Sequence, residues 1–138
     1  MKITACVENR QGQHLVTLST NDNARTLTIP PRSVGYGSSV NGGELLFLAL
    51  ATCYCNDIYR EAAKRNIRVE SVEVEVTGDF GAEGEPGKNL RYHTKITADA
   101  GAEVIRALAV ETDRVAEIQN TLRVGTNVTL GEIKALSV

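Results

Sequence analysis

Two cysteines, Cys53 and Cys55, lie two residues apart in an apolar stretch, and a thiol in that setting could act as a nucleophile or a redox group. In a helix their side chains diverge by about 200° around the axis, so a disulfide between them is excluded. A free cysteine in an apolar helix is more often a small core residue than a nucleophile. We accept that interpretation for Cys55.

Cys53 differs because polar residues follow it on the same side of the predicted helix. Asn56, Asp57 and Arg60 stand three, four and seven residues later, and this spacing places them along one stripe. One interpretation is that an Asp57–Arg60 pair satisfies the stripe where the helix leaves the core. The other is that the stripe borders a pocket containing the thiol, and the residues leave both interpretations open.

A reactive thiol needs a positive neighbour, because burial alone raises the thiol pKa and leaves the group inert. Cys53 stands nine residues beyond Glu44, too deep in the helix to gain from its dipole, and Asp57 disfavours a thiolate. The cation must therefore come from elsewhere. The candidates are Arg10, Arg32 and Arg60.

Other classes of site find little support. His14 and His93 lack metal-ligand spacing, and no Gly-Lys-Ser/Thr nucleotide cradle occurs, so we expect no metal and no cofactor. A net charge of -2 gives no bulk attraction to nucleic acid or to an anionic membrane. Three cysteines without C-x-x-C spacing and no secretory signal predict reduced thiols in the cytoplasm.

The elements that would position these residues follow from periodicity. Alternating residues predict a hairpin of two strands near the start of the chain and a third strand ended by Pro30. The predicted ranges are 3–7, 15–19 and 25–29. A helix from about Glu44 to Asn66 comes next. Its first half is apolar on every side and should be enclosed by protein, whereas its second half is charged and should emerge into solvent.

Two further alternating segments, 72–77 and 90–96, predict a second hairpin in which Glu73 and Glu75 face Arg91, His93 and Lys95. A helix over 102–110 and a final strand over 127–130 complete the order. We therefore predict one α+β domain over residues 1–138, with antiparallel sheets wrapped around a long central helix. This helix has more apolar surface than so small a chain easily covers, which indicates a partner subunit.

Glu44 to Cys53, with the sequence ELLFLALATC, strongly resembles the central-helix signature of the OsmC/Ohr (organic hydroperoxide resistance) superfamily, whose reactive cysteine falls at Cys53. Asp57 resembles the acidic residue that often stands four beyond this cysteine in the OsmC-like branch. Residues 120–125 are similar to the segment after the family's second cysteine. The element order agrees as well, so the resemblance covers nearly the whole chain.

The resemblance implies an intertwined homodimer that reduces organic hydroperoxides through a thiol, without metal or flavin. It also implies that an arginine of the N-terminal hairpin, here Arg10, and a glutamate at the helix start hold the cysteine as thiolate. Glu44 is the candidate for that glutamate, although the family position aligns with Gly43. Ala116 occupies the place of the second cysteine.

We therefore expect a one-cysteine cycle, in which Cys53 becomes a sulfenic acid and an external dithiol returns it to the thiol. A rival hypothesis is a non-catalytic dimer whose cleft holds a small apolar ligand beside Cys53. A third is a purely structural or regulatory dimer with no reactive thiol.

Overall fold

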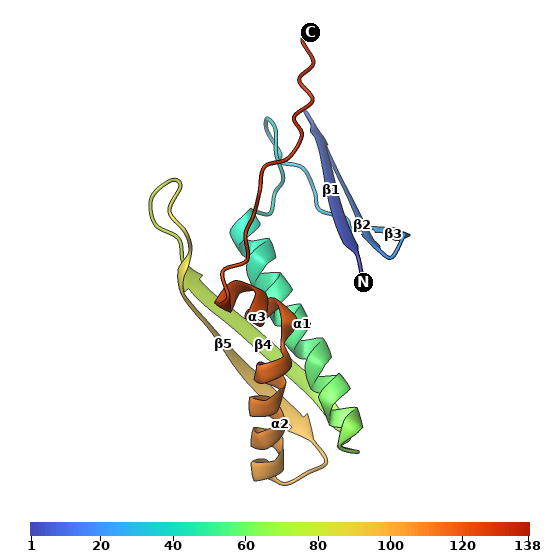
Figure 1. Cartoon of the computed structure of the whole chain (residues 1–138), viewed down its shortest axis with the longest axis vertical. Helices are drawn as coiled ribbons and strands as arrows, with labels where there is room; N and C mark the ends of the chain where they lie inside the picture. The colour runs from blue at the N-terminus through green and yellow to red at the C-terminus, as the bar shows by residue number, and fades with distance from the viewer. The chain divides into compact units, whose positions relative to one another are not determined.

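A computed structural model describes all 138 residues of the chain. The chain forms two compact units, Met1–Leu46 and Phe47–Val138, and each is described by itself. The elements in chain order are β1 (Ile3–Arg10), β2 (Gln13–Thr20), β3 (Asn23–Thr26), α1 (Gly42–Lys64), β4 (Val69–Asp79), β5 (Lys88–Ala98), α2 (Ala102–Val115) and α3 (Glu117–Arg123) (Figure 1). The α+β class is therefore confirmed, whereas a single domain over 1–138 stays a prediction.

The first unit contains an antiparallel sheet in the order β1-β2-β3. The predicted third strand over 25–29 is wrong in its bounds, because β3 pairs with β2 over Asn23–Thr26 only. Its register is set by Asn21 and Asp22, which both have positive φ and form the tight turn between the two strands. This turn starts β3 two residues early, and the strand ends before Pro30.

Helix α1 begins at Gly42, two residues before the predicted start, because Asn41 caps it. The Asn41 Oδ1 accepts a hydrogen bond of 2.8 Å from the Glu44 backbone N–H, and the Asn41 Nδ2 donates one of 2.6 Å to the Glu44 Oε1. The first of these bonds satisfies one free backbone N–H of the first turn. The side chain of Glu44 thus takes part in the helix cap.

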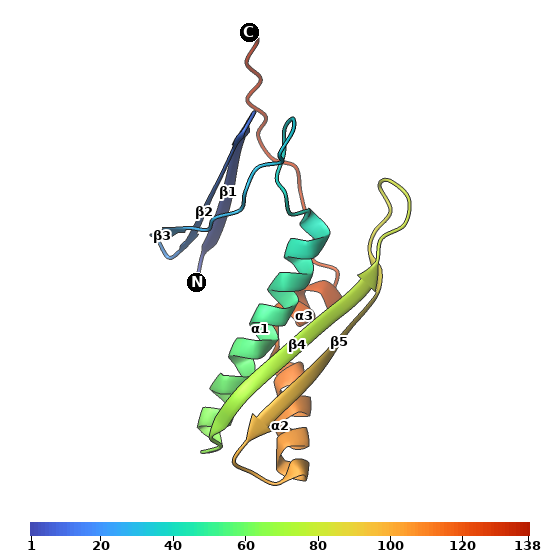
Figure 2. The same cartoon turned by 180° about the vertical axis from the view of Figure 1, so that it is seen from behind.

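The second unit has two layers, a β4–β5 hairpin and the helices that lie on one face of it (Figure 2). The register places Glu73 opposite Lys95 and Glu75 opposite His93, which confirms two of the predicted cross-strand pairings. Residues of α1 and α2 form the buried core against the inward side chains of the hairpin. That core comprises Tyr54, Ile58, Ala62, Leu108 and Ala116.

The burial along α1 does not follow the expected division into an enclosed half and an exposed half. Leu48, in the apolar first half, is 56% exposed, whereas Asp57 and Glu61 in the charged second half are buried. These carboxylates tolerate burial because both bind the guanidinium of Arg60, and Glu61 also accepts a 2.8 Å bond from the Lys64 Nζ. Charge alone therefore did not predict which half leaves the core.

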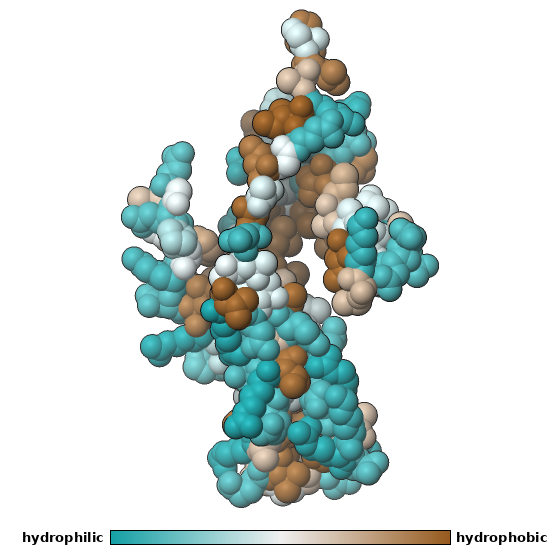
Figure 3. All heavy atoms as spheres, viewed as in Figure 1, coloured by the Kyte–Doolittle hydropathy of each residue, from teal (hydrophilic) through white to brown (hydrophobic).

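The end of the chain differs from its prediction. Helix α2 runs to Val115, five residues beyond the expected end, and α3 follows after a break at Ala116. The predicted strand over 127–130 is absent, because no neighbouring strand supplies a hydrogen-bonding partner there. The face over α2 is mainly hydrophilic with separate hydrophobic side chains (Figure 3). None of the helices is both long enough and apolar enough to span a membrane.

Candidate active site

Cys53 lies midway along α1, partly exposed, and two carboxylates lie beside its sulfur. The Sγ donates to the Asp57 Oδ2 at 3.4 Å and to the Glu117 Oε2 at 3.9 Å. Asp57 stands one helical turn further along α1, as its i+4 spacing requires. Glu117 belongs to the first turn of α3, 64 residues away in the chain, so sequence spacing gave no signal for it.

Arg60 binds the carboxylates around the thiol. Its Nη1 lies 3.0 Å from the Asp57 Oδ1 and 3.1 Å from the Glu117 Oε1, and its Nε lies 3.1 Å from the Glu61 Oε1. The first interpretation of the polar stripe is therefore confirmed, because the Asp57–Arg60 pair exists. The second stays a prediction, because Asp57 contacts the sulfur of Cys53 but the pockets described below are lined by other residues.

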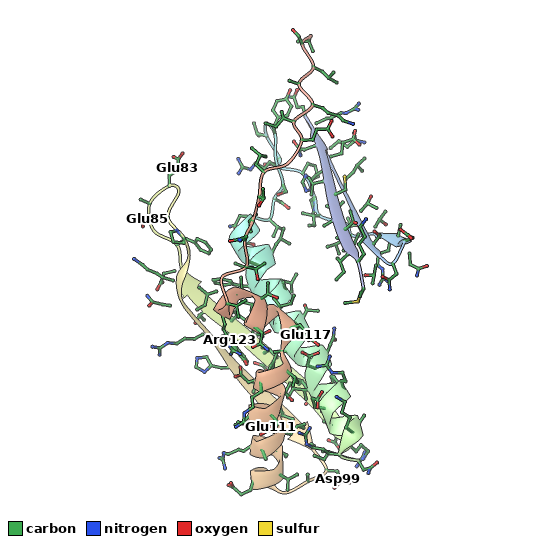
Figure 4. The ribbon with its side chains drawn as sticks, in the orientation of Figure 1. Glu83, Glu85, Asp99, Glu111, Glu117 and Arg123 are labelled. Atoms are coloured by element: carbon green, nitrogen blue, oxygen red, sulfur yellow. The ribbon has the colours of Figure 1, made fainter.

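The corner between α2 and α3 positions Glu117. Arg123 of α3 reaches back to α2, where its Nη2 lies 2.7 Å from the Asp113 Oδ1 and its Nη1 donates to the Asp113 backbone carbonyl at 3.2 Å. The hydroxyl of Tyr92 in β5 donates to the same carboxylate. Figure 4 shows Glu117 at the start of α3 beside α1, and Arg123 near the hairpin. The corner is thus tied to the hairpin as well as to α2.

Electrostatics around the sulfur favour the protonated thiol. Burial is the main factor that raises the pKa of Cys53, and the charge and hydrogen bond of Asp57 raise it further, against a lowering effect of the Ile118 backbone N–H. Burial also raises the pKa of Asp57. The backbone N–H of Glu117 and the charge of Arg60 hold the pKa of Glu117 below its usual range. Within this unit, the thiol is therefore the resting form at neutral pH.

The donor atoms of Cys53, Asp57 and Glu117 lie within 4.8 Å of one another, a combination that metal ions accept and that the sequence did not predict. The guanidinium of Arg60 already supplies positive charge to both carboxylates. We assign no metal to these groups.

Arg10 and Glu44 belong to the other unit, Met1–Leu46, and each has a local partner. The Arg10 Nη2 lies 3.0 Å from the Glu8 Oε1, and Glu44 pairs with Asn41. Arg32, the remaining candidate, donates from Nε to the Ser38 carbonyl at 3.4 Å. A role of these residues at Cys53 stays a prediction.

Cys55 lines a different surface of α1. It borders an open groove of about 250 Å³ together with Ala51, Thr52, Asn56 and Val74. No hydrogen bond or ion pair reaches its sulfur, in contrast to Cys53. Cys55 is therefore partly exposed rather than the core residue that the sequence predicted.

A cavity of about 130 Å³ lies between the hairpin, α1 and α3. The exposed wall area is mainly apolar, and Arg91, Gln119 and Arg123 contribute polar groups. The Gln119 Nε2 donates to the Leu50 carbonyl at 3.0 Å, while its Oε1 is buried without a partner. Sequence reasoning missed this cavity because residues from four separate elements form it.

A family model described as OsmC-like protein matches residues 35–131, which is most of the chain. No curated protein sequence matches. An OsmC-like protein from Mycoplasma pneumoniae has a similar structure, with a TM-score of 0.62 and 19% identity over 88% of this chain and 86% of its own.

Two further solved structures share the fold. An OsmC-like protein of unknown function from Vibrio cholerae has a TM-score of 0.61 and 17% identity, over 88% of this chain and 93% of its own. A Legionella pneumophila protein described as organic hydroperoxide resistance protein OsmC has a TM-score of 0.55 and 23% identity, over 87% of this chain and 89% of its own. These likenesses establish the fold.

Proposed function

The chain belongs to the OsmC-like family, and we propose that it is a thiol peroxidase that reduces organic hydroperoxides through Cys53. The observation that carries this proposal is a partly exposed thiol in mid-helix, contacted by Asp57 and Glu117, which Arg60 in turn binds. The description of the Legionella pneumophila neighbour as an organic hydroperoxide resistance protein supports the substrate class.

The proposed cycle uses one cysteine. The Cys53 sulfur attacks a peroxide oxygen and becomes a sulfenic acid, and the alcohol leaves. Ala116 stands where the resemblance places a second cysteine, so an external dithiol reduces the sulfenic acid to thiol and water and is itself oxidised to a disulfide. Such a cycle needs neither metal nor flavin, and it suits the reducing conditions of the cytoplasm.

A homodimer is part of the proposal. Leu48 of α1 and Val110 of α2 are each 56% exposed in the single chain, and a second copy would cover apolar side chains of this kind. Arg10 and Glu44 stay proposed site residues, as the family resemblance implies, because Arg60 is held by carboxylates. Light scattering after size-exclusion chromatography is expected to give twice the mass of the chain.

The decisive test compares the two helix thiols. Hydroperoxide consumption with excess dithiol is expected to fall to the buffer background in Cys53→Ser and to persist in Cys55→Ser. Trapping with a dimedone probe is expected to label Cys53 stoichiometrically and to leave Cys55 unlabelled. Consumption that is unchanged in Cys53→Ser would exclude the peroxidase.

The second candidate function is non-catalytic binding of a small apolar ligand. The cavity beside Gln119 favours it, because its walls are apolar and a buried carbonyl oxygen there has no donor. A small apolar alcohol is a suitable probe for that oxygen. If this function is correct, Leu122→Trp is expected to abolish the alcohol's chemical shift changes in NMR, and the wild type is expected to consume no hydroperoxide.

A further inference from the structure

The position of Asp57 relative to the sulfur suggests a task in the chemical step. Its Oδ2 accepts the hydrogen bond of the Cys53 thiol at 3.4 Å, so the carboxylate already lies on the path of the proton that must leave. Glu117 is less suited, because its Oε2 is 3.9 Å away and its side chain is 64% exposed. Asp57 has a side chain that is only 7% exposed.

Arg60 fixes the orientation of that carboxylate. It binds the Oδ1 of Asp57 at 3.0 Å and leaves the Oδ2 to the thiol. Its own position is held by Glu61 and Glu117, both at 3.1 Å. Arg60 is therefore a positioning residue, and one oxygen of Asp57 is kept available for proton transfer.

We propose that Asp57 is a catalytic residue that takes the proton of the Cys53 thiol as the sulfur attacks a hydroperoxide and then delivers it to the departing alkoxide. This inference rests on the proposed peroxidase function. The sulfur lone pair forms a bond to the terminal peroxide oxygen, and the O–O bond breaks with its electron pair on the RO fragment. The thiol proton passes through the Asp57 Oδ2 to this fragment. The sum is Cys–SH + ROOH → Cys–SOH + ROH, in which sulfur is oxidised by two electrons and the peroxide is reduced.

Burial and charge around the Cys53 sulfur favour this proton transfer through Asp57, which we call the relay. Because burial and Asp57 raise the pKa of Cys53, little thiolate exists at neutral pH, and attack is assisted when a base removes the proton in the same step. Burial also raises the pKa of Asp57, which makes it a stronger base than an exposed aspartate and leaves its acid form able to protonate an alkoxide.

The test separates proton transfer from charge. In Asp57→Asn, loss of a negative charge favours the thiolate, so alkylation of Cys53 by iodoacetamide is expected to be as fast as in the wild type or faster. The rate of sulfenic acid formation with cumene hydroperoxide is expected to fall about 100-fold, which is the lower range for loss of acid–base catalysis. Asp57→Glu should recover part of the hydroperoxide rate because it keeps a carboxylate. If Asp57 acts through charge alone, both reactions accelerate together in Asp57→Asn, and the relay is excluded.

Glu111→Gln is the matched control, because it removes a carboxylate of α2 that pairs with Arg114 at 2.9 Å and contacts neither Cys53 nor Asp57. Its two rates are expected to stay within about twofold of the wild type. A wild-type measurement covers the case in which Asp57→Asn does not fold. The rate with hydroperoxide is expected to be about twofold or more slower in D₂O, whereas equal or faster reaction would contradict proton transfer in the rate-limiting step.

Different results would contradict the peroxidase function and the proton transfer through Asp57. A wild-type protein that forms no sulfenic acid with hydroperoxide contradicts the peroxidase itself. A wild-type protein that reacts, together with an equally reactive Asp57→Asn variant, contradicts only the relay.

Discussion

Helix α1 presents two different sides within the unit Phe47–Val138. Tyr54 and Ile58 are at most 2% exposed and pack against the β4–β5 hairpin. The neighbouring side carries Cys53, Asp57 and Arg60, which contact α3 through Glu117. The first side holds the helix in place by burial of apolar surface, and the second uses that fixed backbone to set distances around a sulfur atom. Stability and chemistry should therefore respond to different substitutions.

The largest expected effect is a loss of stability from a substitution on the side of α1 that packs against the hairpin. Ile58 is fully buried, so Ile58→Ala should lower the free energy of unfolding by about 2–5 kcal/mol and Ile58→Val by about 0.5–1.5 kcal/mol. Urea unfolding measures both. The pH dependence of Cys53 alkylation in the folded Ile58→Val protein should match the wild type. A shifted profile would mean that the two sides are coupled.

On the side of α1 that carries Cys53, Arg60→Met is expected to have the largest effect on the reactivity of the thiol. Without the guanidinium, the carboxylates of Asp57 and Glu117 lose their shared countercharge, so the pKa of the Cys53 thiol rises. Alkylation by iodoacetamide at pH 8 should slow roughly threefold, and stability should fall by about 1 kcal/mol because the pair is partly exposed. Arg65→Met is the control, since Arg65 pairs with Glu61 at 3.6 Å. Equal rates in the two variants would contradict this role of Arg60.

The pH dependence of Cys53 alkylation tests whether residues outside the unit Phe47–Val138 affect the thiol. The raised pKa of Cys53 predicts that alkylation reaches half of its maximal rate above the ordinary thiol value of about 8.5. The unfolded chain ionises first, so the contribution of this thiol to stability is full below about pH 8.5 and is lost as pH rises through the folded pKa. A midpoint below 8.5 that returns upward in Arg10→Met would instead indicate that Arg10 reaches the sulfur.

The smallest effect is expected for Glu117→Gln. The charge of Glu117 is the least of the influences that raise the pKa of Cys53, and its side chain is 64% exposed. Alkylation should therefore accelerate by less than about twofold, with a stability change within about 0.5 kcal/mol. A tenfold acceleration would show that Glu117, rather than Asp57, dominates the field at the sulfur.

Sequence periodicity predicted the parts of the fold that local patterns determine. The alternation in β4 and β5 and its charge pairing were confirmed, and so was the i+4 relation of Cys53 and Asp57. The final strand over 127–130 was wrong, because alternation alone supplies no partner strand. Helix α3 was missed because its seven residues give too short a periodic signal.

The candidate site could be predicted only in part, because sequence patterns report local geometry and not tertiary contacts. The stripe of Cys53, Asp57 and Arg60 lies on one helix, and helical geometry predicts it from spacing. Glu117 and the cavity beside Gln119 depend on how α3 folds back across α1, which is a tertiary contact. The burial of Asp57 was also unexpected, because the charged second half of the helix was predicted to emerge into solvent.

The distance in sequence between Cys53 and Glu117 has a consequence for biosynthesis. The cysteine leaves the ribosome 64 residues before this carboxylate, a delay of roughly 3–13 s at ordinary elongation rates. During that interval the nascent thiol lacks α3 and the contacts that α3 provides. Its final environment is assembled only after α3 has been synthesised.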